Sequence, residues 1–371
     1  MNASEQANFL VYAGTYTVGP FSTGASEGIY IFRLNVSSGA MDFVGKAAGL
    51  ENPTYVTADP QGRLLFAAHE TERFLEHPGG GVSVFAIDPQ SGALTLLSQK
   101  PTHGTLSCYV TIAPSERFLL VANYGGGSVS VLPIQKDGRL GDVADLVQHQ
   151  GRGPDPVRQK GPHPHCVILD SRGRRALVAD LGLDQIVVYP FNREQGKLER
   201  HPVTSVRTAD GAGPRHLAFH PDGVHVYLVN EINSTLTVYS YDATDGTLEE
   251  LQTVSTLPDT FVGANSAADI HVSPSGQFVY ASNRGHDSIA IFEVDTSTGR
   301  VVPIGHEPTQ GKAPRGFAID PTGTWLLAAN QKSDSMISFR INPQTGRLVP
   351  VHRVSVPTPT CLCIVPLSDH V

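Results

Sequence analysis

The sequence predicts an all-β protein: a seven-bladed β-propeller with four antiparallel strands in each blade. Three observations predict it. Short apolar runs recur in a fixed order, the turns between them recur at a nearly constant spacing, and one copy of the repeat is divided between the two ends of the chain. A period of roughly 50 residues made of short β-runs is typical of propeller blades.

Each repeat begins with two apolar runs joined by a tight turn, as in PRHLAFHPDGVHVYLVNE at 214–231. A third run follows, such as STLTVYSY at 234–241, and a turn of the type DGTL leads into a fourth, weaker run. Val, Ile, Tyr and Phe are frequent in the runs, and Gly, Asp and Pro separate them, which indicates strands and turns. The first turn of each complete repeat is centred on Pro60, Pro114, Ser171, Pro221, Pro274 and Pro321.

The two ends of the chain supply the strands of a seventh repeat. PTCLCIVP at 359–366 matches the first run of a repeat, FLVYAGTY at 9–16 matches the second, and GIYIFRLNVSSGAM at 28–41 matches the third with its turn. We therefore expect a blade shared between the termini, which closes the ring and removes exposed sheet edges. We expect residues 1–371 to form this one domain, because two β-sandwiches would not explain a constant period.

Composition and charge exclude several classes of partner. The formal net charge is −8, so the chain lacks the basic surface that nucleic-acid binding requires. No apolar run approaches the roughly 18 residues of a membrane helix, and the start lacks the features of a secretory signal. The cysteines have no C-x-x-C spacing, so we expect buried thiols and a cytoplasmic protein. These cysteines are Cys108, Cys166, Cys361 and Cys363.

Two positions of each repeat are expected at the same mouth of the central channel. One lies six residues before the turn position and the other ten after it, at the hairpin end away from the turn. All fourteen positions surround one mouth of the channel if the first run is the innermost strand. The occupants are Thr54, Cys108, His165, Arg215, Ala268, Arg315 and Thr360 at the first position, and Glu70, Tyr124, Leu181, Glu231, Arg284, Gln331 and Thr15 at the second.

This predicted ring is uneven, because five chemically active residues gather in four consecutive blades. They are His165, Arg215, Glu231, Arg284 and Arg315. Arg215 and Glu231 alone could form no more than a salt bridge at the rim. Three arginines with one carboxylate leave a surplus of positive charge, however, and that surplus suits an anionic ligand. The five together therefore favour a binding or catalytic mouth.

Three further residues lie close to this ring in the sequence. His163, two residues before His165, is a candidate substrate-binding group, or else a hydrogen-bonded filler. His216 and Asp269 occupy the next register position, so we expect their side chains to turn into the blade wall as structural support. The sequence carries no zinc, phosphate-loop or nucleophile-elbow motif, so we expect no metal and no cofactor. A Ca²⁺ or Zn²⁺ site built from separate Asp, Asn and Glu side chains stays open.

Several segments together resemble the lactonase family of seven-bladed propellers. They are LVYAGTYT, GPHPHCVILD, GPRHLAFHPDG with VNE, ASNRGHDSIAIF and APRGFAIDPTG, and the similarity covers essentially the whole chain. That family includes the propeller-type 6-phosphogluconolactonase and the fungal 3-carboxy-cis,cis-muconate lactonizing enzyme. The resemblance implies that His165, Arg215, Glu231 and Arg284 are the functional set. Arg315 is added by the repeat register alone.

The residues suit the opening or closing of a lactone. His165 or Glu231 can act as the base, Arg215 can stabilise the oxyanion, and Arg284 and Arg315, with His163, can hold a phosphate or carboxylate. The resemblance favours hydrolysis of 6-phosphogluconolactone, and cyclisation of a carboxymuconate by the same residues is the alternative. The expected partner is thus a small anionic lactone, and the oligomeric state stays open.

A non-catalytic propeller scaffold is a third hypothesis, which an uneven charged mouth disfavours. Loops 71–80 and 151–162 could cover the mouth or form an interface, and Lys160 is a candidate for a further contact to the anion.

Overall fold

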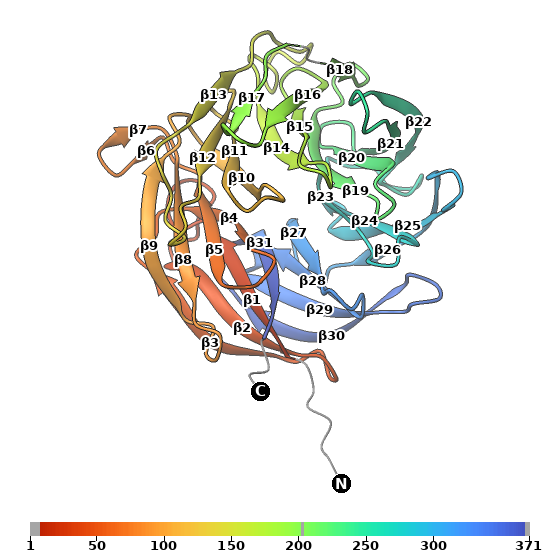
Figure 1. The fold of residues 1–371 in the computed structure, drawn as a ribbon. Helices are drawn as coiled ribbons and strands as arrows, with labels where there is room; N and C mark the ends of the chain where they lie inside the picture. Colours follow the sequence, from red (N-terminus) through yellow and green to blue (C-terminus); the bar gives the residue numbers. More distant parts are fainter. Residues whose placement is uncertain (1–7, 202–203, 368–371) are drawn as a thin grey trace.

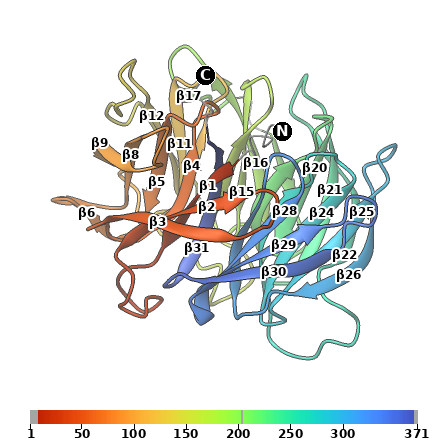
Figure 2. The same ribbon diagram turned by 90° about the horizontal axis from the view of Figure 1, so that it is seen from below.

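The computed structural model describes residues 8–201 and 204–367, which form seven sheets of four or five strands arranged around a central axis (Figure 1). The innermost strands of neighbouring sheets contact one another around the ring. Figure 2 shows the same ring turned by 90°. No helix in these described residues has the length and apolar character needed to cross a bilayer.

The blades follow one another along the chain, and in the first six the chain runs from the innermost strand outward. Blade 1 consists of β4 (Pro53–Ala58), β5 (Leu64–His69), β8 (Gly81–Ile87) and β9 (Leu94–Pro101). Blade 2 consists of β10 (Ser107–Ile112), β11 (Phe118–Asn123), β12 (Ser128–Pro133) and β13 (Asp145–Gln148). Blade 3 consists of β14 (Pro164–Leu169), β15 (Arg175–Asp180), β16 (Gln185–Asn192) and β18 (Thr204–Arg207), and β17 (Lys197–Leu198) also pairs with β16.

The next three blades repeat this order. Blade 4 consists of β19 (Pro214–Phe219), β20 (His225–Asn230), β21 (Thr235–Tyr241) and β22 (Leu248–Ser255). Blade 5 consists of β23 (Ser266–Val272), β24 (Phe278–Arg284), β25 (Ser288–Val294) and β26 (Val301–Pro308). Blade 6 consists of β27 (Pro314–Ile319), β28 (Trp325–Asn330), β29 (Ser335–Ile341) and β30 (Leu348–Ser355), with the short 3₁₀-helix η1 (Gln331–Ser333) after β28.

The seventh blade confirms the prediction of a sheet shared between the two ends of the chain. It consists of β31 (Pro359–Pro366), β1 (Asn8–Thr15), β2 (Gly28–Asn35) and β3 (Met41–Ala48). The antiparallel pairing of β1 with β31 closes the ring. The single-domain prediction also covered 1–7, 202–203 and 368–371, which lie outside the described residues. A small hairpin, β6 (Arg73–Phe74) with β7 (His77–Pro78), occupies most of the loop 71–80.

The hydrophobic core is divided among the gaps between blades. Each of the seven neighbouring pairs of blades encloses one cluster of buried apolar side chains. Both faces of a middle strand are therefore buried, as all six residues of β28 illustrate. This is why the sequence shows continuous apolar runs rather than strict alternation. Buried hydroxyls such as that of Tyr227, which donates to the carbonyl of Gly299 at 3.0 Å, join one blade to a turn of the next.

An irregularity of pairing recurs in the innermost strand of every blade and positions the site. In β19, Pro214 pairs with Asn230 and His216 pairs with Val229, so Arg215 is an extra residue in a β-bulge. Bulges re-aim the side chains of the strand that carries them. The extra residue is Thr54, Cys108, His165, Arg215, Arg315 or Thr360 in six blades, and β23 carries two, Ala268 and Asp269. Apart from Asp269, these are the positions that the sequence register placed at the channel.

Candidate active site

A cavity of about 360 Å³ opens at the end of the channel where the bulges lie. Its lining includes four predicted site residues, His165, Glu231, Arg284 and Arg315. His165 and Arg315 are bulge residues of β14 and β27, Arg284 ends β24, and Glu231 directly follows β20. Four blades thus deliver the predicted side chains to one place, as the repeat register indicated.

The carboxylate of Glu231 is the centre of an ion-pair network with three arginines. Its Oε2 accepts from Nε of Arg215 at 2.8 Å and lies 3.0 Å from Nη2 of Arg284. Its Oε1 accepts from Nη2 of Arg158. Burial disfavours the charged carboxylate, but Arg284, Arg215, His165 and Arg158 outweigh it and hold the pKa of Glu231 well below its usual range. A carboxylate in this state is a poor base and a good anchor for guanidinium groups.

His165 is the group in the cavity that can accept a proton. Its side chain is buried, and that burial, together with Arg215 and His216 nearby, holds the pKa of the imidazole well below its usual range. The ring is therefore neutral at pH 7. It makes edge-to-face contacts with the rings of Tyr124 and His216, at centroid distances of 5.3 and 5.2 Å, and these contacts fix its orientation.

Arg315 is held at the cavity wall by residues from blades 7 and 1. Its guanidinium lies over the ring of Tyr16, 5.3 Å from the centroid, and 3.8 Å from Oε2 of Glu70. The Tyr16 hydroxyl donates to Oε1 of Glu70 at 2.8 Å, which fixes the carboxylate. Burial works against the cation, but Tyr16, Glu70 and Glu231 raise the pKa of Arg315 above its ordinary value.

Arg215 lies beneath the cavity rather than in its wall. Its side chain is 2% exposed, and it lines a much smaller cavity of about 10 Å³ in the channel. There Nη1 of Arg215 donates to Nε2 of His216 at 3.1 Å, and Nδ1 of His216 is bonded to Oδ1 of Asp269 at 2.8 Å. Arg215 is therefore placed to support Glu231 and His216 from below.

The expectation that His216 and Asp269 turn into the blade wall is wrong. Both line the small channel cavity together with Arg215. The bulges at Arg215 and in β23 interrupt the in-and-out alternation on which that expectation rested. The expectation that these two residues support the structure agrees with the hydrogen bonds of Asp269. Besides its bond to His216, its carboxylate accepts from the main-chain N–H of Phe317 at 3.1 Å and so joins blades 4, 5 and 6.

His163 and Lys160 are absent from the cavity lining. The imidazole of His163 stacks on the ring of Tyr124 at 4.5 Å, and its Nδ1 donates to the main-chain carbonyl of the same residue at 2.8 Å. His163 therefore buttresses Tyr124, which does line the cavity. Lys160 is exposed to solvent.

Arg158 is the main cavity residue that the sequence analysis did not select. It comes from loop 151–162, which is anchored by the buried Gln159 through bonds to the carbonyl of Leu181 and the carboxylate of Asp184. Arg158 lies outside the repeat, so no register could align it with the ring. With it, three guanidinium groups line the cavity against the two carboxylates of Glu70 and Glu231, so the mouth keeps a surplus of positive charge.

Removing Arg158 should weaken substrate binding without removing the chemistry. We expect Arg158→Ala to raise KM for an anionic substrate about tenfold, with kcat within a factor of about three, because one hydrogen bond to a charged group is lost. Steady-state kinetics with the candidate lactones measure both constants. Arg152→Ala, an exposed arginine of the same loop, is the matched control and should change neither.

The family model described as "Lactonase, 7-bladed beta-propeller" matches residues 10–364 of the chain. The chain belongs to this lactonase family. A 6-phosphogluconolactonase of Bacillus subtilis is 37% identical over 312 residues, 84% of this chain and 85% of that protein.

Solved structures of similar lactonase propellers superpose over nearly the full length. One is a putative 6-phosphogluconolactonase of Bacteroides fragilis, 35% identical, with a TM-score of 0.88 over 98% of this chain and 99% of the other. Another is the periplasmic gluconolactonase of Pseudomonas aeruginosa, 33% identical, with a TM-score of 0.89 over 97% and 100%. These relatives make a lactone the expected substrate class.

Proposed function

We propose that the protein hydrolyses 6-phosphogluconolactone to 6-phosphogluconate at the cavity around His165. The observation that carries the proposal is a neutral, buried imidazole beside a surplus of guanidinium groups. The first can accept a proton from water, and the second can bind a polyanion. The names of the Bacillus and Bacteroides relatives support the same substrate.

In the proposed reaction His165 takes a proton from a water molecule while the water oxygen bonds to the lactone carbonyl carbon. The carbonyl oxygen becomes an oxyanion, and Arg284, which lines the cavity, donates to it. The ring C–O bond then breaks, and His165 returns the proton to the departing ring oxygen. The products are a hydroxyl group and a carboxylic acid, which ionises at neutral pH. Arg284 takes the role first expected of Arg215, because Arg215 lies below Glu231.

A second hollow, of about 460 Å³, adjoins the cavity and offers a place for the phosphate. The two share Phe21, Ser266, Arg284 and Arg315 in their linings. The second hollow adds two exposed lysines, Lys312 and Lys332, against one carboxylate, that of Asp287. A sugar lactone with its carbonyl at His165 can therefore extend a terminal phosphate toward ammonium groups that are free to rotate onto it.

The proposal is tested by hydrolysis assays at fixed pH on 6-phosphogluconolactone, unphosphorylated gluconolactone and 3-carboxymuconate, each corrected for the uncatalysed rate. We expect kcat/KM to be highest for 6-phosphogluconolactone. Faster turnover of the muconate would assign the site to cyclisation, and rates at background for all three would favour a scaffold.

Removing the two lysines should erase the preference for a phosphorylated substrate. We expect Lys312→Ala and Lys332→Ala each to lower kcat/KM for 6-phosphogluconolactone about tenfold, since each removes one charged contact. The rate with unphosphorylated gluconolactone should stay within a factor of two. Lys160→Ala is the matched control, because that lysine lines neither hollow. If kcat/KM fell equally for both lactones, the assignment of the phosphate to this hollow would be wrong.

We also propose a cytoplasmic location. Cys108, Cys166, Cys361 and Cys363 are all free thiols, which is usual in a reducing compartment. The Pseudomonas aeruginosa relative is named as periplasmic, so cell fractionation is the test. Recovery of the protein with periplasmic markers would contradict the proposal.

A further inference from the structure

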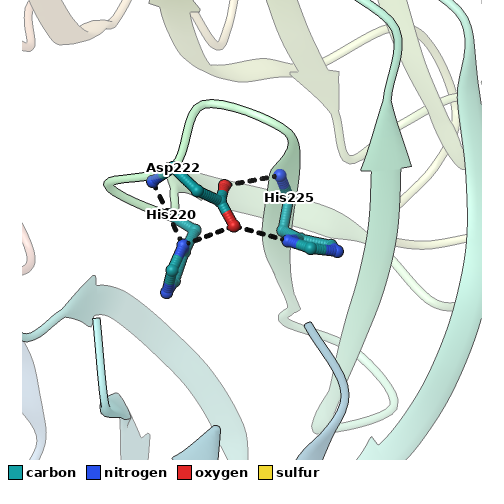
Figure 3. Close-up of side chains that lie close together, drawn as sticks. All are labelled: His220, Asp222 and His225. Carbon is teal, nitrogen blue, oxygen red and sulfur yellow. Dashed lines mark hydrogen bonds and ion pairs between the residues drawn. The ribbon is translucent and has the colours of Figure 1, made fainter. Parts of the chain in front are cut away.

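Two histidines and an aspartate meet in one hairpin turn (Figure 3). This turn lies at the end of β19 opposite to the active-site cavity. His220 directly follows β19, Asp222 lies in the turn, and His225 begins β20. His220 is five residues beyond Arg215, a separation of about 17 Å along a strand. The lactonase mechanism uses none of the three.

The carboxylate of Asp222 is fixed between the two imidazoles. Its Oδ1 accepts from the main-chain N–H groups of Val224 and His225 at 2.8 and 3.1 Å, which is the ordinary bonding of an aspartate in a turn. The other carboxylate oxygen, Oδ2, makes neither of these turn bonds. It lies 2.8 Å from Nδ1 of His220 and 2.7 Å from Nδ1 of His225. One nitrogen from each ring thus lies next to the same carboxylate oxygen, and the three atoms are all within 4.8 Å of one another (Figure 3).

The contact made by Nε2 of His220 indicates which ring nitrogen carries the proton. Nε2 of His220 lies 3.0 Å from the carbonyl oxygen of Gly276, and a carbonyl only accepts, so Nε2 carries the proton. In the neutral ring, Nδ1 then presents a lone pair, which the main-chain N–H of Asp222 approaches at 3.2 Å. That lone pair also faces a carboxylate oxygen, and the two repel unless a cation lies between them. A histidine that donates one ring N–H to a carbonyl and turns the other nitrogen to a metal is the usual arrangement of a metal ligand.

The cluster is sheltered but accessible. The side chain of His220 is 7% exposed and that of Asp222 is 28% exposed. Both residues line a hollow of about 510 Å³ between blades 3, 4 and 5. An ion held by the three side chains would therefore keep a position open to water.

We propose that His220, Asp222 and His225 bind one zinc ion, in a site separate from the lactonase cavity. Two imidazoles, one carboxylate and a water molecule make up a common tetrahedral coordination of zinc. The ion would connect the first residue of β20 to the residue that follows β19, and so fix the hairpin that joins the two inner strands of blade 4. Because the strand length separates it from His165, its loss should leave lactone hydrolysis unchanged.

The experiment is a zinc titration of the full-length protein, stripped with a chelator, in competition with a chromophoric chelator. We expect one equivalent of zinc to bind, at least about 100-fold more tightly than in Asp222→Asn or His225→Ala. Asp222→Asn keeps a side-chain oxygen for the two main-chain N–H groups, so the turn is preserved. His77→Ala, an exposed histidine on β7, is the matched control and should bind as the wild type does.

Two further measurements test the zinc site independently of the proposed lactone hydrolysis. Zinc should raise the melting temperature of the wild type and of His77→Ala, but not of Asp222→Asn. In all four proteins kcat/KM for the lactone should be the same, within a factor of two, with and without zinc. Zinc binding that is undetectable, or equally tight in the wild type and the two ligand variants, would overturn the proposal, because a proton on His220 would then account for the cluster.

Discussion

Replacing His165 with asparagine is expected to lower kcat for 6-phosphogluconolactone by about 10²- to 10⁴-fold, which is the usual contribution of a general base. Asparagine retains a polar group of similar reach but accepts no proton from water. KM should change little, because the anion is held by Arg284, Arg315 and the two lysines. Steady-state kinetics corrected for spontaneous hydrolysis measure both constants.

The pH dependence of the wild type provides a second readout of the same group. The pKa of His165 is well below its ordinary value, so the ring is deprotonated and able to act as a base at pH 7. In kcat/KM, which reports the free enzyme, activity should therefore fall only as pH drops well below about 6.5. A substrate phosphate bound in the adjoining hollow adds negative charge to the site and raises the pKa of the imidazole, so the acid limb of kcat should lie at higher pH than that of kcat/KM.

His163→Asn is the matched control for this prediction. His163 directly precedes β14, two residues before His165. Its ring stacks on Tyr124 and does not line the cavity. We expect less than about a tenfold change in kcat and an unchanged acid limb. A His165→Asn variant that keeps wild-type turnover, or a His163→Asn variant that loses it, would contradict the assignment of the base.

Replacing Glu231 with glutamine is expected to lower both stability and activity. The change leaves Arg158, Arg215 and Arg284 without their shared counter-charge, and breaking a buried ion pair in this way costs about 3 kcal/mol. For a chain of this size that is a fall in melting temperature of about 4 °C. Arg284 also loses its orientation, so kcat/KM should fall about 100-fold. Thermal unfolding and lactone kinetics measure the two effects.

The stability difference between the wild type and Glu231→Gln should depend on pH in one direction. Because the folded pKa of Glu231 is depressed, its contribution is complete above the unfolded pKa of about 4.3 and is lost as pH falls through the folded value. The two melting temperatures should therefore differ at pH 7 and converge in acid.

Glu70→Gln is the control for Glu231→Gln, because the Glu70 carboxylate lies 3.8 Å from one arginine, Arg315. Its loss should lower the melting temperature by less than half as much. Equal losses would show that Glu231 is not the centre of the network.

The repeat made the fold and the ring of candidate residues predictable from the sequence. The constant spacing of the turns assigned strands to blades, and the split copy assigned the termini to one sheet, as the pairing of β1 with β31 confirms. The same register brought His165, Glu231, Arg284 and Arg315 to one cavity. The repeat is informative in a propeller because each blade packs against its neighbours through equivalent positions.

The features that the sequence did not predict depend on strand pairing, loop conformation and side-chain packing. A bulge adds one residue without changing the spacing between turns, so the inward turn of His216 was not foreseen. Arg158 and Lys312 come from loops and Lys332 from the short 3₁₀-helix η1, where side-chain direction depends on tertiary contacts. The depth of Arg215 below Glu231 likewise follows from side-chain packing rather than from strand position.

The structure of the protein with bound 6-phosphogluconate tests the account most directly. We expect the carboxylate of the product beside His165 and Arg284, and its phosphate within hydrogen-bonding distance of Lys312 or Lys332. A product molecule bound at the opposite end of the channel, or bound in the cavity with its phosphate turned away from both lysines, would contradict the account.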